Sequence, residues 1–373
     1  MLVGEPPGPI RGKQDRAAGK SDAVTSLRMA DLGSLKLVLF GESVIDLPRF
    51  WFDDHTAVDG FLRLCEFDTD NPLDMARLHE LHHEATVYLT DVHRYRLPLQ
   101  IEQPHEIHDL FLAAASPTHN RVQRFACMTL KVMHILHHIS GRELLFNTPI
   151  SEAQLFDRLN AKVFGAIDTM RASGIGIQEF AAGKKSKTSL ATKLLAKRNN
   201  LATHIFDKLR FRIVVNSRDD LVLTVLYLVR NLCPFNYVLP EQSQNTIVTP
   251  DDLVRVLDLA PEVVTRYWES NTSADPVVRP PLNEFSATTY RCVNFVADIP
   301  MRIDDVAPQA SPAIAFVQTE IQLMDLETSK TNERGESSHS LYKKRQRARV
   351  RARLENNVTD VRVDPPDTLP DDD

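Results

Sequence analysis

The stretch from residue 183 to residue 217 constrains the fold most strongly, because its hydrophobic period changes there from that of a helix to that of a strand. Leucines recur at helical spacing over about residues 189–200, which predicts an amphipathic helix. In residues 210–215, two arginines alternate with large apolar side chains, which is typical of a strand with one buried face. A helix that leads directly into such a strand favours helices packed on a sheet.

Positive charge gathers on and before this predicted helix. Lys184, Lys185 and Lys187 precede it. Three polar residues spaced four apart line one of its faces, namely Ser189, Lys193 and Lys197. Cations and the free N–H groups of a helix N-terminus both attract anions, so this cluster suits a polyphosphate. A lysine face that is simply solvated is the alternative.

A single acid, Asp207, lies between the predicted helix and the strand. The polar face of the strand carries Arg210 and Arg212 and opens toward that acid. A carboxylate beside phosphate-binding cations is what a Mg²⁺ site for phosphoryl chemistry needs. The residues therefore favour a magnesium and nucleotide site around Asp207.

These residues resemble the synthetase domain of RelA/SpoT-type (p)ppGpp synthetases, which are nucleotide pyrophosphokinases. Further segments of that family's pattern follow in family order between residues 183 and 343. The matched pieces are Lys185-Ser186 with Ser189, Asp207 with Arg212, Tyr290-Arg291, Thr319-Glu320-Ile321-Gln322, and the segment from Gly335 to Lys343. The resemblance implies a nucleotidyltransferase-type fold and transfer of pyrophosphate from ATP to a nucleotide 3′-hydroxyl.

The resemblance also implies a role for each matched residue. Asp207 and Glu320 would hold Mg²⁺, and Glu320 would activate the acceptor hydroxyl. Arg212 would stabilise charge, and Gln322 would support Glu320. The residues implied for the ATP phosphates are Lys185, Ser186, Ser189, Lys193 and Lys197. The residues implied for the acceptor, for which GDP or GTP is favoured, are Tyr290, Asn294 and His339.

Some positions depart from the family pattern. They are Gly183 in place of an arginine, His204 in place of a lysine, Arg210 in place of a glycine, and Asn294 in place of a histidine. The first three bear on ATP affinity, and the last bears on the acceptor. Alternatives are therefore a tRNA or adenine-nucleotide acceptor, or a catalytically inactive nucleotide-binding module. The basic segment from Lys343 to Arg353 favours RNA as a partner, although a solvated helix neutralised by the acidic tail is equally open.

Length and composition allow more than one domain. The chain has 373 residues, of which 43% are hydrophobic and 25% charged, as is ordinary for a globular protein. The net charge of −6 gives the whole chain no general affinity for nucleic acid. Because no apolar run is long enough to span a membrane and no signal peptide is recognisable, we expect a cytoplasmic protein without a membrane partner.

We expect an α/β (α+β) protein with a mixed sheet of about five strands flanked by helices. The predicted regions are a disordered tail over residues 1–35, a helical region over 36–172, a nucleotidyltransferase domain over 173–348 with an insertion at about 236–281, and a basic then acidic tail over 349–373. Besides residues 210–215, strands are predicted over residues 289–296 and 314–323.

A competing motif lies in the helical region. The sequence His79-Glu80-Leu81-His82-His83 satisfies the pattern His-Glu-x-x-His on a predicted helix over residues 74–93. In a zinc metallohydrolase, two histidines at this spacing bind zinc and the glutamate acts as general base. A histidine-rich surface helix is the alternative, since the chain contains 13 histidines.

Overall fold

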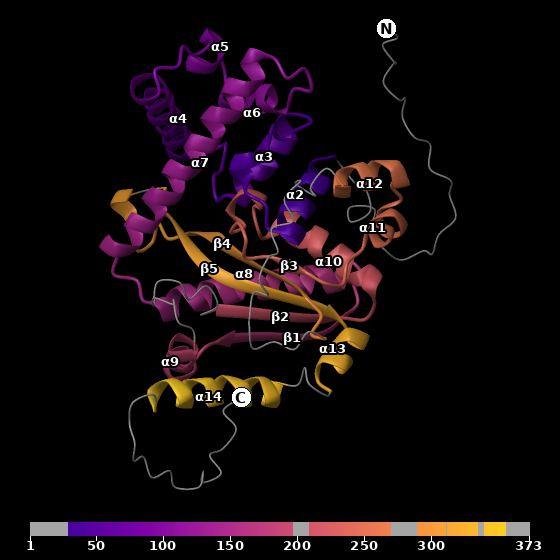
Figure 1. The fold of residues 1–373 in the computed structure, drawn as a ribbon. Helices are drawn as coiled ribbons and strands as arrows, with labels where there is room; N and C mark the ends of the chain where they lie inside the picture. Colours follow the sequence, from indigo (N-terminus) through magenta and orange to yellow (C-terminus); the bar gives the residue numbers. More distant parts are fainter. Residues whose placement is uncertain (1–28, 197–208, 270–288, 311, 335–338, 356–373) are drawn as a thin grey trace.

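A mixed sheet of five strands organises the molecule (Figure 1). The structure is a computed structural model, and it describes residues 29–196, 209–269, 289–310, 312–334 and 339–355. The strands are β1 (Ile177–Lys184), β2 (Leu209–Val215), β3 (Gln244–Asn245), β4 (Val293–Arg302) and β5 (Ile314–Asp325), in the spatial order β1-β2-β5-β4-β3. β2 and β5 are parallel, whereas the other neighbouring pairs are antiparallel. The predicted α/β class with a mixed sheet flanked by helices is confirmed.

Helices precede the sheet in the sequence and also connect its strands. Those before β1 are α2 (Met29–Phe40), α3 (His55–Leu64), α4 (Pro72–Val87), α5 (Leu99–Glu102), α6 (Ile107–Ala115), α7 (Arg121–Asn147) and α8 (Glu152–Ala172). Those after β1 are α9 (Lys187–Ala196), α10 (Arg218–Asn231), α11 (Pro250–Leu257), α12 (Pro261–Glu269), α13 (Leu326–Asn332) and α14 (His339–Leu354). None of these described helices has both the length and the apolar character needed to cross a bilayer.

One face of the sheet is apolar and forms the larger core, because alternate residues of the central strands are apolar. Phe211 of β2 and Phe295 of β4 are fully buried there, and α8 and α10 supply much of the packing. α2 joins the same core through Leu35, which is 1% exposed. The predicted tail over residues 1–35 thus overlaps α2, in which Leu32 and Leu35 are buried.

The helices α3 to α7 build a second core, which meets the sheet along α7. Gly141 of α7 lies directly on β5, where an added Cβ atom would come within 2.4 Å of the Phe316 ring. The close approach of this helix to the sheet thus requires a residue without a side chain. On the same side, Arg302 of β4 pairs with the buried Asp74 of α4, so both packing and charge join the helical part to the sheet.

At this junction, His137 makes stability dependent on pH. The residue is 7% exposed, and its Nδ1 lies 2.7 Å from the Tyr237 hydroxyl, with which it shares a hydrogen bond. Burial, together with the nearby charges of Arg77, His134 and His138, lowers the pKa of His137 from 6.5 to about 3. Between these two values the unfolded chain binds a proton that the folded chain excludes, so the free energy of unfolding falls as the pH falls.

We expect the His137 contribution to reduce the free energy of unfolding by about 2 kcal/mol between about pH 7 and pH 5. His137→Gln keeps a hydrogen-bond acceptor for Tyr237 but does not titrate, so it should remove this part of the pH dependence. Urea denaturation of both proteins at the two pH values measures the difference. An unchanged pH dependence in the variant would show that His137 is not the titrating group.

Candidate active site

Two rows of residues run across the strands on the face of the sheet opposite the apolar core. The first row is Gly183, Arg210, Glu320 and Val296, and the second row is Ala181, Arg212, Gln322 and Asn294. Because paired residues in register point to the same face, five polar residues predicted or noted from the sequence share one surface. We call this surface the polar sheet face and define it by Arg210, Arg212, Asn294, Glu320 and Gln322.

The central contact of the polar sheet face is an ion pair between Arg210 and Glu320. The Nε of Arg210 donates to Oε2 of Glu320 at 2.7 Å. The Glu320 residue is only 7% exposed, and a carboxylate this buried is costly unless a cation or hydrogen bonds satisfy it. Arg210, which stands where the resembled family has glycine, therefore directly stabilises the charge of the predicted catalytic acid.

Asn294 satisfies the second oxygen of the same carboxylate. With its amide nitrogen turned toward β5, Nδ2 lies 3.0 Å from Oε1 of Glu320 and 3.2 Å from the carbonyl oxygen of Ile321. This orientation is assigned from the hydrogen-bond network, since the opposite one would place the amide oxygen against acceptors only. The Asn294 side chain thus contacts the predicted catalytic acid, and its predicted contact with the acceptor stays a prediction.

The guanidinium of Arg212 is turned toward the helix that follows β5. Its Nη2 donates to Oγ of Ser329 at 3.0 Å and lies 3.5 Å from Oε1 of Glu333. Helix α13 is fixed in this place because Asp325 caps it, accepting from the backbone N–H of Thr328 at 2.8 Å. The buried Nε of Arg212 has no hydrogen-bond partner among the described residues.

Tyr290 lies just before β4, at the margin of the polar sheet face. Burial raises the pKa of its hydroxyl, with Cys292 adding to the shift and the charges of Arg210 and Arg212 opposing it. The tyrosine therefore stays protonated and presents a half-buried ring beside the two arginines. An aromatic ring in this position suits stacking on a base, although stacking itself remains a prediction.

The predicted ATP loop follows β1 at the end of the sheet where β2 begins. Register pairs Lys184 with Leu209, so the turn containing Lys185 and Ser186 lies at the same end as the Arg210 row. Ser186 caps helix α9, since the backbone N–H of Ser189 donates to its Oγ at 3.2 Å. The structure therefore brings the N-terminus of a lysine-bearing helix to the end of the sheet that also carries Glu320.

The basic helix α14 packs along α9 (Figure 1). Arg353 of α14 donates to the backbone carbonyl oxygen of Leu195 in α9. Cations of both helices are consequently close, and most of the α14 cations are exposed. The members of this basic surface are Lys187, Lys193, Lys343, Lys344, Arg345, Arg347, Arg349, Arg351 and Arg353. Such a surface attracts polyanions.

Other predicted site residues are not placed by the structure. Asp207, Lys197 and the departure at His204 lie outside the described residues. His339 is the first residue of α14. The shared magnesium site of Asp207 and Glu320 therefore stays a prediction, as does the role of His339.

Arg210 is a site residue whose contact with Glu320 the sequence did not predict. The alternation of residues 210–215 already put Arg210 and Arg212 on one face, which was the available signal. Its partner Glu320 lies 110 positions further along the chain, and only the parallel pairing of β2 with β5 brings the two together. The two departures at Arg210 and Asn294 both contact Glu320, so they act on the same carboxylate.

The competing zinc motif is divided between the surface and the core. His79 and His83 are exposed on α4, whereas Glu80 pairs with Arg77 at 2.5 Å. His82 is buried, with Nε2 2.8 Å from the Ile101 carbonyl oxygen, and burial lowers its pKa. Within the described part of the chain, the group of three side chains suited to a metal ion lies elsewhere and contains neither exposed histidine.

Solved structures similar to this chain include alarmone synthetases. The small alarmone synthetase 1 from Bacillus subtilis bound to its product pppGpp is 15% identical, with a TM-score of 0.32, and the match covers 55% of this chain and 88% of that one. The small alarmone synthetase 2 from Bacillus subtilis is 15% identical (TM-score 0.30; 55% and 91% covered). A GTP pyrophosphokinase family protein from Streptococcus pneumoniae is 14% identical (TM-score 0.29; 55% and 85% covered). No protein-family model and no curated protein sequence matches this chain.

Proposed function

We propose that this chain is a nucleotide pyrophosphokinase, which transfers pyrophosphate from ATP to the 3′-hydroxyl of a guanine nucleotide. The observation that carries the proposal is the polar sheet face, where Glu320 and Gln322 lie beside two arginines. These residues belong to separate motifs that match one family in order, and they share one surface. A carboxylate, guanidinium groups and a phosphate-binding helix N-terminus are the parts that phosphoryl transfer needs.

Each described residue has a task in this reaction. Glu320 accepts the proton of the attacking 3′-hydroxyl, and the Arg210 guanidinium beside it stabilises the carboxylate in its charged, proton-accepting form. Arg212 presents its partly exposed guanidinium group to the transferring phosphates. The α9 N-terminus, with Lys185, Ser186 and Ser189, holds the ATP phosphates, while the Tyr290 ring stacks on the acceptor base.

Mg²⁺ is the cofactor that this function implies, and Asp207 and Glu320 are the residues proposed to hold it. Glu320 fits the role, because each carboxylate oxygen has two acceptor positions and Arg210 and Asn294 occupy one on each. When bound, the ion supplies charge neutralisation on the phosphates.

The test is a transfer assay with γ-labelled ATP, Mg²⁺ and one acceptor at a time: GDP, GTP, ADP or tRNA. We expect labelled product with GDP or GTP, together with an equal amount of AMP, since pyrophosphate transfer leaves AMP behind. Omitting Mg²⁺ should stop the reaction. Absence of both labelled product and AMP with every acceptor would reject the enzyme. Nucleotide binding without turnover would then identify an inactive binding module.

An RNA acceptor is the second candidate, and the basic surface formed by α9 and α14 favours it. If tRNA is the acceptor, reversing two exposed charges by Arg347→Glu and Arg349→Glu should strongly weaken labelling of tRNA. The difference from the unaltered chain should be largest at low salt. The same variant should label GDP normally, because neither residue belongs to the polar sheet face. Equal labelling of tRNA by both proteins would argue against this acceptor.

A further inference from the structure

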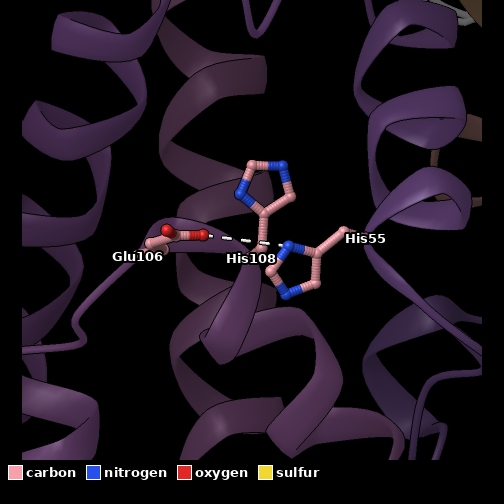
Figure 2. A group of neighbouring side chains, drawn as sticks. All are labelled: His55, Glu106 and His108. Carbon is pink, nitrogen blue, oxygen red and sulfur yellow. Dashed lines mark ion pairs between the residues drawn. The ribbon is translucent and has the colours of Figure 1, made fainter.

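Two histidines and a glutamate from different parts of the helical region come together at the start of two helices (Figure 2). His55 is the first residue of α3, Glu106 is the N-cap of α6, and His108 follows in the first turn of α6. Their ligand atoms all lie within 4.8 Å of one another, with His55 Nδ1 3.8 Å from Glu106 Oε2. The two imidazole rings stack at 4.9 Å between centroids and 15° between planes.

Asp59 fixes the orientation of the His108 ring through its Nε2 atom. The carboxylate oxygen Oδ1 of Asp59 lies 2.8 Å from Nε2 of His108 and also accepts from the Thr69 hydroxyl at 2.9 Å. A carboxylate oxygen can only accept from an imidazole N–H, so in this contact Nε2 is the nitrogen that carries the proton. The Nδ1 atom of the ring is then left with its lone pair. A carboxylate that holds one imidazole nitrogen while the other binds an ion is the usual support of a histidine ligand.

We propose that His55, Glu106 and His108 bind a divalent transition-metal ion, Zn²⁺ in the first instance, with Asp59 as the positioning residue. Two imidazoles and a carboxylate match the ligand preference of zinc, and His55 and Glu106 are about half exposed, which leaves room for a water as fourth ligand. The partial positive charges of the two helix N-termini disfavour a cation at this site. The carboxylates of Asp59, Glu106 and Asp109 offset that effect, since all three belong to this corner.

The bound ion would join the N-terminus of α3 to that of α6. These helices belong to one hydrophobic core, but the three ligands are exposed or half-buried and are not members of that core. Ion binding should therefore raise the thermal midpoint of the protein without being required for folding. The site lies apart from the polar sheet face, so its existence does not depend on the proposed pyrophosphokinase reaction.

The test uses the untagged full chain, stripped with EDTA and dialysed, then titrated with Zn²⁺ or Co²⁺. We expect one ion per chain by elemental analysis and a visible Co²⁺ absorption band of tetrahedral character. His55→Ala should abolish the band and weaken binding by more than about a hundredfold, whereas Asp59→Asn should weaken it by about 10- to 100-fold and shift the band. His55 is exposed, so its loss leaves the fold intact, which circular dichroism can verify.

The matched control is the double variant His79→Ala and His83→Ala, which removes the competing pair on α4. It should bind Zn²⁺ and Co²⁺ as the unaltered chain does. Two results would overturn the proposal: an unaltered chain that binds no stoichiometric ion in the titration, or binding that survives His55→Ala. Loss of the ion only in the α4 double variant would assign the metal to the His-Glu-x-x-His motif instead.

Discussion

Glu320→Gln is expected to reduce the rate of pyrophosphate transfer by roughly 10²- to 10⁴-fold, the usual cost of losing a general base. The substitution keeps the size of the side chain, and its amide oxygen still accepts from Nε of Arg210. It removes the negative charge that would accept the hydroxyl proton. Initial rates of AMP release with saturating ATP and GDP measure the effect, and circular dichroism verifies that the buried position tolerates the change.

The matched control for this substitution is Glu327→Gln on α13. Glu327 is an exposed carboxylate in the first turn of the helix that follows β5, and it makes no contact with the polar sheet face that the structure describes. Its loss should leave the rate within about twofold of the unaltered chain. If Glu320→Gln kept a rate within about tenfold, Glu320 would be a structural partner of Arg210 rather than the base.

Asp74→Ala should be the most destabilising single substitution considered for this chain, with a loss of about 3–5 kcal/mol in the free energy of unfolding. The Asp74 residue is fully buried at 0% exposed, and its oxygens accept from Nη1 and Nη2 of Arg302 at 2.8 and 2.5 Å. The backbone N–H of Asp68 donates to the same carboxylate at 2.7 Å. Removing it leaves the Arg302 guanidinium with only Asp304 and the carbonyl oxygen of Glu66 as acceptors, and it leaves the Asp68 N–H without its acceptor, at the place where α4 meets β4.

Urea denaturation followed by circular dichroism measures this loss, and an Asp305→Ala variant serves as comparison. Asp305 also accepts both guanidinium nitrogens of one arginine, Arg158 at 2.8 and 2.6 Å, but that pair is on the surface. Solvent already screens it, so its removal should change the midpoint little. Equal effects of the two substitutions would mean that burial of Asp74 does not set its energetic importance.

The sequence by itself determined the class of the fold and much of its local structure. The sequence indicated a helical region over residues 36–172, and the structure has the helices α3 to α8 there. It also predicted strands over residues 210–215 and 314–323, which match β2 and β5. The longer of these elements were predictable because the buried face of each repeats at a single period.

β1 was not predicted, because it pairs only with β2 at the edge of the sheet and most of its residues are exposed. An edge strand of this kind has no alternation of apolar and polar residues to detect. Residues 29–35, the first part of α2, were assigned to the predicted tail, although residues 36–40 fell in the predicted helical region. The burial of α2 depends on α10 and β4, which come much later in the chain.

Only the tertiary structure decided which partners the candidate catalytic acid has. In the sequence, Arg210, Asn294 and Glu320 lie in three separate segments, and the first two differ from the family pattern. The order β2-β5-β4 brings all three to one point, where the arginine and the asparagine each satisfy one oxygen of the carboxylate. Strand order and register depend on long-range packing of whole faces, so no local pattern in the chain contains them.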